Sequence, residues 1–121
     1  MFRLGVIEES IVHQEVLEII QPYFFSQRIE EISDDEYPIW HINEYHISEK
    51  KIIEFLDILK ESIKFTWYIH AFNDTVLYVA LHKKFFALSL KRDLSWNEMI
   101  EYGVSIAQVE KSFLENIPLH I

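Results

Sequence analysis

Apolar and other residues alternate in several short segments of the chain, which is the pattern of half-buried β-strands. Phe2, Leu4 and Val6 share one face of the first such segment, Phe2–Ile7. The segment Ile39–Ile47 is rich in aromatic and β-branched residues, which favour strands. The other predicted strands are Phe25–Ile32, Phe65–Phe72, Val76–Leu81 and Phe85–Leu90.

Apolar residues recur at spacings of three and four in two longer segments, which predicts amphipathic helices. The first covers residues 12–24, and Pro22 is expected to stop or kink it near Gln21. The second covers residues 49–63, with Ser48 as its predicted cap. Its apolar stripe is the clearest in the chain and consists of Ile52, Phe55, Leu56, Leu59 and Ile63.

A third helix is predicted to begin at Trp96, because Ser95 can cap it and Glu98 completes a capping box. Gly103 could end this helix in a left-handed conformation, or Ser105 could begin a further short helix. The segment Phe113–Ile121 has no clear period.

The order of these elements, β-α-β-β-α-β-β-β-α, predicts a single α+β domain over residues 1–121. It is the order of a ferredoxin-like antiparallel sheet with two helices on one face, extended by a C-terminal hairpin and helix. Both Trp40 and His41 lie in the strand Ile39–Ile47, and Trp67, Tyr68, His70 and Phe72 lie in the strand Phe65–Phe72. One face of the sheet is then apolar, and the other is aromatic with polar tips. Such a face is expected to be covered by the C-terminal helix, by another subunit or by a ligand.

Composition and charge exclude several classes of protein. The chain has 121 residues and no cysteine, so disulfides and cysteine-ligated metals are excluded. Its net charge of −9 argues against nucleic-acid binding, which needs clustered cations. Stretches without charged residues do not exceed nine residues, which is too short to span a bilayer. We therefore expect a soluble cytoplasmic protein that binds neither nucleic acid nor membrane.

Six histidines are the main candidates for chemistry, because imidazole titrates near neutral pH. No pair has the spacing of a helical zinc site, so no metal and no cofactor is predicted. His41, His46 and His70 lie on or beside predicted strands, where a half-buried histidine with one hydrogen bond is the ordinary structural explanation. If a catalytic group exists, the candidates are His70, Tyr68 and His41.

The most distinctive string is W-Y-x-H-x-F-N, formed by residues 67–73. It resembles a segment of small, functionally uncharacterised prokaryotic proteins, in which an aromatic strand follows an Ile/Leu-rich helix and precedes a hairpin. Tyr102-Gly103-Val104-Ser105 resembles a second element of these proteins. The resemblance implies a fold and no mechanism, and it makes Trp67, Tyr68 and His70 the first place to look for function.

Three hypotheses follow. The first is a non-catalytic binding or assembly module, which uses its aromatic sheet face or the strand Phe85–Leu90 to form a homodimer or to hold a small ligand. Its site would comprise Trp67, Tyr68, His70, Phe72, Trp40 and His41. The alternative is a small enzyme with His70 as general acid or base, assisted by Tyr68 or His41, between the sheet and the C-terminal helix. A third is capture of a basic protein partner by the acidic first half, residues 1–64, which holds fourteen acidic and six basic residues.

Overall fold

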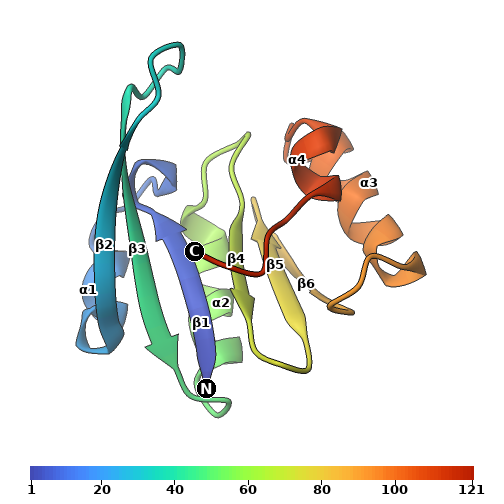
Figure 1. Ribbon diagram of the computed structural model, residues 1–121, viewed down its shortest axis with the longest axis horizontal. Coiled ribbons are helices and arrows are strands. Elements are labelled where there is room, and N and C mark those ends of the chain that lie inside the picture. The colour runs from blue at the N-terminus through green and yellow to red at the C-terminus, as the bar shows by residue number, and fades with distance from the viewer.

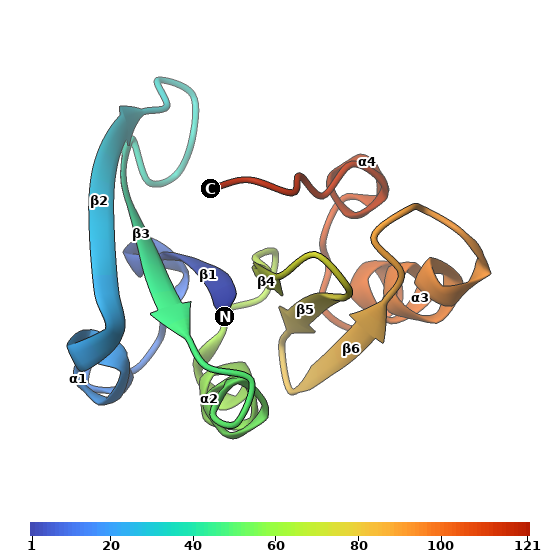
Figure 2. The ribbon, with the colours of Figure 1, turned by 60° about the horizontal axis from the view of Figure 1, so that its bottom comes forward.

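Six strands form one antiparallel sheet with helices on both sides (Figure 1 and Figure 2). The computed structural model describes all residues, 1–121. The strand order is β2-β3-β1-β4-β5-β6. The strands are β1 (Phe2–Ile7), β2 (Phe24–Glu31), β3 (Ile39–Ile47), β4 (Ile69–Phe72), β5 (Leu77–Leu81) and β6 (Lys84–Leu88). The α-helices are α1 (Val16–Ile20), α2 (Ile52–Leu59), α3 (Asn97–Ser105) and α4 (Lys111–Glu115), and short 3-10 turns cover Glu8–Ser10, Gln21–Tyr23, Lys60–Ser62 and Leu94–Trp96.

We call the face of the sheet that carries Phe2, Leu4 and Val6 the first face; α1 and α2 pack on it (Figure 2). The stripe of α2 packs into this core through Ile52, Phe55, Leu56 and Leu59, all buried. Burying each large apolar side chain of this kind stabilises the fold by roughly 1.5–3 kcal/mol. The first face is therefore an ordinary hydrophobic core.

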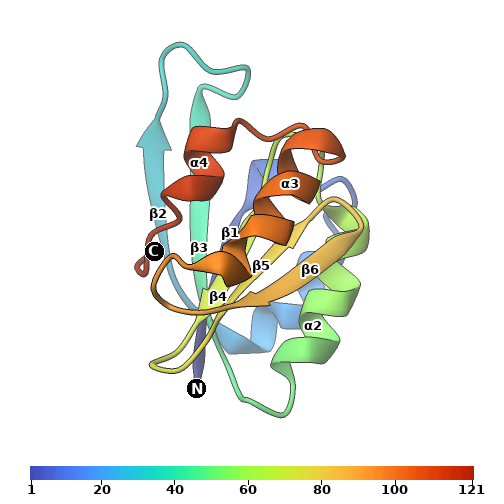
Figure 3. The ribbon, with the colours of Figure 1, turned by 90° about the vertical axis from the view of Figure 1, so that its right-hand side faces the viewer.

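We call the opposite face the second face, and the C-terminal part of the chain lies over it. Helix α3 crosses over β5 and β6, and α4 lies beside it (Figure 3). Both helices form a second core with Val79, Leu81 and Leu88. The segment after α4 then crosses toward β1 and ends in front of it (Figure 1). Of the three predicted covers for this face, the structure supplies the C-terminal helix.

The prediction of an α+β protein with an antiparallel sheet is confirmed. The β4-β5-β6 meander is also present, with an Asn73 side chain that accepts hydrogen bonds from the amides of Thr75 and Val76 at its first turn. The six-strand order does not by itself establish the ferredoxin-like arrangement, which stays a prediction.

The helix predicted over residues 12–24 is much shorter than its apolar pattern. Ile11 pairs with Ile63 in a β-bridge, and the amide of Val12 donates to the carbonyl of Ser62, so the chain there is held extended. Only Val16–Ile20 is α-helical, and Pro22 lies in a 3-10 turn. The β-bridge between Ile11 and Ile63 thus prevails over the helical spacing of apolar residues in the first part of this segment.

The predicted helix caps are wrong in detail. The Ser48 side chain makes no cap bond to α2. Instead, the backbone carbonyl of Ser48 accepts from the amides of Lys51 and Ile52. Asp93 rather than Ser95 caps the turn before α3, through a bond from the Ser95 amide. Gly103 is helical, and it permits α4 to pack closely against α3.

The strand predicted over Phe65–Phe72 begins only at Ile69. Thr66 has a positive φ of 75°, and its amide donates to the carbonyl of Ala107. This break ends the simple alternation of side chains and brings both Trp67 and Tyr68 toward the second face.

No helix combines the length and the apolar composition that crossing a membrane requires.

Candidate ligand-binding cavity

A cavity of about 520 Å³ lies on the second face, beside the part that α3 and α4 cover. Its floor comes from β1, β3 and β4. Its walls come from β2 and the β2–β3 loop, the turn before β4, the α3–α4 connection, α4 and the segment after α4. The residues that line it are Gly5, Ile7, Arg28, Glu30, Asp35, Glu36, Tyr37, Trp40, Ile42, Thr66, Trp67, Tyr68, His70, Gln108, Val109, Glu110, Phe113, Pro118, His120 and Ile121. The volume falls within the ~300–1,000 Å³ range of ordinary small-molecule sites.

Aromatic rings form one wall of the cavity. The ring centroids of Trp40 and Trp67 are 5.1 Å apart, and those of Tyr37 and Trp67 are 6.0 Å apart, with interplanar angles near 60°. Tyr68 adds a further ring, and burial raises the pKa of its hydroxyl. The wall therefore offers ring faces and edges to an occupant.

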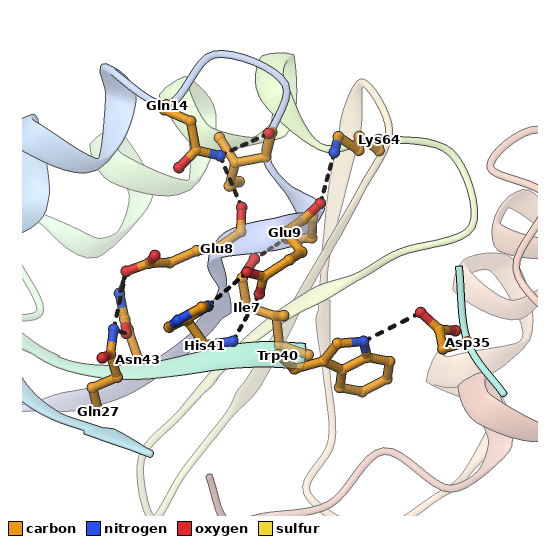
Figure 4. A network of polar contacts seen from close by, with 12 residues as sticks. Ile7, Glu8, Glu9, Gln14, Gln27, Asp35, Trp40, His41, Asn43 and Lys64 are labelled. Atoms are coloured by element: carbon orange, nitrogen blue, oxygen red, sulfur yellow. Dashed lines mark hydrogen bonds and ion pairs between the residues drawn. The ribbon is translucent and has the colours of Figure 1, made fainter. Parts of the chain in front are cut away.

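Hydrogen bonds hold the β2–β3 loop against this wall (Figure 4). The Asp35 Oδ2 atom accepts from the amide of Tyr37 at 2.8 Å and from the Trp40 indole Nε1 at 3.3 Å. The Lys64 Nζ atom donates to the Tyr37 hydroxyl at 3.0 Å and to the Glu9 carbonyl at 2.8 Å, and it lies 4.5 Å from the Tyr37 ring centroid. The aromatic wall is thus fixed before any ligand arrives.

His70 joins the cavity floor to the C-terminal segment. Its Nε2 atom donates to the carbonyl of His120 at 3.0 Å, which fixes the ring as the Nε2-protonated tautomer. Burial lowers the His70 pKa to about 4, because a charged imidazole would lose its hydration there. Gly5 provides the space for this contact, since a Cβ atom there would lie 3.0 Å from the Ile121 side chain and 3.2 Å from the His70 ring.

Carboxylates outnumber cations around the cavity. Arg28 is the only lysine or arginine in the lining, and it donates to Glu30 on the same strand. Asp35 is engaged in the loop, whereas Glu36 and Glu110 form no ion pair. The net charge around an occupant is therefore negative.

Four of the predicted site residues, Trp40, Trp67, Tyr68 and His70, line this cavity together. Phe72 does not, because it is buried in the second core and lies under the Arg3 guanidinium. His41 lies on the first face, away from His70. It therefore cannot act with His70 as a pair.

His41 belongs instead to a polar network on the first face (Figure 4). The Glu9 carboxylate accepts from the His41 amide and contacts the His41 Nδ1 atom, both at 2.7 Å. The hydrogen bond to Glu9 raises the His41 pKa. Burial works against ionisation of Glu9, but the His41 hydrogen bonds outweigh it and lower the Glu9 pKa.

Sequence reasoning missed the cavity residues outside the two aromatic strands. They come from β1, from β2, from the acidic turn at 33–38, from the α3–α4 connection and from residues 113–121, which have no clear period. The acidic turn with Tyr37 was the one available signal, since binding residues lie disproportionately on loops.

Comparison of the chain with protein-family models, with curated proteins and with solved structures found no match. The resemblance carried by Trp67, Tyr68 and His70 therefore stays a prediction.

Proposed function

We propose that this protein is a small binding module whose cavity holds a planar, positively charged small molecule. The observation that carries the proposal is the aromatic wall of Tyr37, Trp40 and Trp67 facing a space bordered by unpaired carboxylates. A cation over the face of a tryptophan or tyrosine is attracted by the ring quadrupole, by about 0.5–2 kcal/mol.

The dimensions of the site support a small ligand rather than a macromolecule. The cavity is bounded on one side by the sheet and on the other by the C-terminal segment, which is hydrogen-bonded to His70. A flat ring system can lie against Trp40 and Trp67, while its charged group is directed toward Glu36 or Glu110. The mixture of an apolar wall with a few polar groups is typical of sites that select a ligand by orientation.

Two other roles of this surface receive less support. The aromatic face is not a free, flat surface for self-association, because α3, α4 and the C-terminal segment lie over much of it (Figure 3). A catalytic role for His70 needs a second titratable group within hydrogen-bond reach. The His70 ring instead donates to a backbone carbonyl, and the Tyr68 ring meets it edge-on at a centroid distance of 5.9 Å.

Calorimetric titration with benzamidine, a planar cation, and benzoate, a planar anion of similar size, tests the proposal. We expect benzamidine to bind saturably at millimolar or lower concentration and benzoate to bind much more weakly. Glu36→Gln and Glu110→Gln should each weaken benzamidine binding by about two- to fivefold, which is the effect of an exposed charge.

Glu54→Gln is the matched control, because Glu54 is exposed on α2 at the other face of the sheet and should leave the titration unchanged. Equal binding of both compounds, or no saturable binding of benzamidine, would contradict the proposal.

We further propose that β1-α1-β2-β3-α2-β4 is a ferredoxin-like unit to which β5, β6, α3 and α4 are added. In support, both crossover helices pack on the first face, and β1 lies between β3 and β4. The cavity then lies on the face that the two crossover helices leave uncovered.

A further inference from the structure

The strand β2 forms one edge of the sheet and no other element covers it (Figure 1 and Figure 2). Seven of its eight residues are exposed and the eighth is half-buried. It includes two largely exposed apolar side chains, Phe25 at 61% and Ile29 at 60%. An open edge of this length presents a row of unpaired backbone groups that can pair with another strand.

The pairing of β2 with β3 determines which backbone N–H and C=O groups of β2 face the open edge. Ile32 donates its amide to the carbonyl of Pro38, in the same register that pairs Arg28 with Ile42. In an antiparallel ladder, hydrogen-bonded and non-hydrogen-bonded pairs alternate. The backbone groups of Arg28 and Glu30 therefore point toward β3, and those of Gln27, Ile29 and Glu31 point outward to the open edge.

Arg28 and Glu30 of β2 are complementary in charge to Glu30 and Arg28 of a second copy when the two strands run antiparallel. We propose that two copies of this chain pair through β2 in antiparallel fashion, with the twofold axis at Ile29. In this register Ile29 exchanges both backbone hydrogen bonds with Ile29 of the second copy. Arg28 then lies opposite Glu30 of the second copy, and Glu30 opposite its Arg28.

The neighbouring registers are less favourable. An axis at Arg28 places the two arginines opposite each other, and an axis at Glu30 does the same to the two glutamates. Like charges directly opposite across strands are destabilising. An axis at Gln27 brings the irregular pairing between Phe24 and Ser26 into the new ladder. Only the axis at Ile29 combines outward hydrogen-bonding groups, opposite charges and a regular strand.

The other open edge, β6, has five residues against the eight of β2. Two of its residues, Phe86 and Leu88, are buried, whereas none of the residues of β2 is buried. The structure thus favours β2 over the last strand for pairing with a second copy.

Size-exclusion chromatography with light scattering tests the proposal through charge reversal. The unaltered protein should be a dimer at micromolar concentration. Arg28→Glu and Glu30→Arg should each raise the dissociation constant about tenfold or more, because each replaces attractive pairs by repulsive ones. An equimolar mixture of the two variants should form a heterodimer, since their charges are then complementary again.

Arg92→Glu provides the control, because Arg92 pairs with Glu115, a residue of α4 remote from β2, and the same charge change there should leave the dimer intact. A second measurement does not depend on these charges. The chain has no cysteine, so Ile29→Cys introduces a single thiol. It should cross-link two copies under mild oxidation, whereas Gln27→Cys should not.

A protein that stays monomeric at several hundred micromolar would overturn the proposal. So would a dimer that both single charge variants leave unchanged, or faster cross-linking at residue 27 than at residue 29. Circular dichroism shows whether each variant is folded.

Discussion

Acidification should destabilise this protein through His70, the histidine that anchors the C-terminal segment. Burial lowers its pKa in the folded protein to about 4, whereas the ordinary pKa of a histidine is 6.5. Between these two values the unfolded chain binds a proton that the folded chain does not bind. The free energy of unfolding therefore falls as the pH falls from about 6.5 to about 4, and the contribution is fully present above about 6.5.

The size of this effect follows from the two pKa values. Their difference corresponds to roughly 3 kcal/mol over the whole window, and to about 2 kcal/mol between pH 7 and pH 5. The hydrogen bond from Nε2 to the His120 carbonyl can persist in either protonation state. The cost therefore arises from placing a charged ring in a buried site.

Urea unfolding of the unaltered protein and of His70→Gln at pH 7, 6 and 5 measures this contribution. Glutamine keeps an amide donor near the His120 carbonyl but does not titrate. The stability advantage of the unaltered protein over the variant should shrink by about 2 kcal/mol between pH 7 and pH 5. Other titrating groups, including His41, are common to both proteins and cancel in the difference.

An advantage that does not change with pH would refute this reasoning. A His70 imidazole that titrates near pH 6.5 in the folded protein, as followed by NMR, would refute it equally.

Three other substitutions test separate parts of the structure. Glu9→Gln should lower the His41 pKa, measured by NMR titration, because the hydrogen bond that raises it is weakened; an unchanged pKa would show that the contact is not maintained in solution. Gly103→Leu should reduce the free energy of unfolding by about 1–3 kcal/mol, because even a Cβ atom there would lie 2.4 Å from the buried Leu114 side chain; unchanged stability in urea would mean that α4 packs elsewhere. Asp35→Ala should speed amide hydrogen exchange in the β2–β3 loop and leave β1 protected, because the loop loses the hydrogen bonds that Asp35 accepts. Unchanged exchange in the loop would show that Asp35 does not hold it in place.

The sequence predicted best the elements whose local pattern agrees with their tertiary contacts. The predicted strand Ile39–Ile47 has the observed bounds of β3, since its aromatic and β-branched residues fit a central strand. The stripe of α2 is also buried as predicted. The helix over residues 12–24 was overestimated, because a β-bridge at Ile11 holds part of that pattern extended.

The candidate site was predictable only in part. Trp40 and Trp67 are far apart in the sequence, and they meet because of the sheet order and the break at Thr66. A threonine gives no sequence signal for a positive φ, since β-branched residues rarely adopt one. The wall formed by the C-terminal segment has no periodic pattern, so its contact with His70 could not be inferred either.

The central claim is that the cavity on the second face holds a planar cation, and the chain's three tryptophans allow a direct test. Trp40 and Trp67 line the cavity, whereas Trp96 is buried in the second core and donates its indole Nε1 to the Ser89 carbonyl. In an NMR titration with benzamidine, the indole signals of Trp40 and Trp67 should shift together and saturate, and that of Trp96 should stay in place. Signals that do not move, or three that move equally, would contradict the claim.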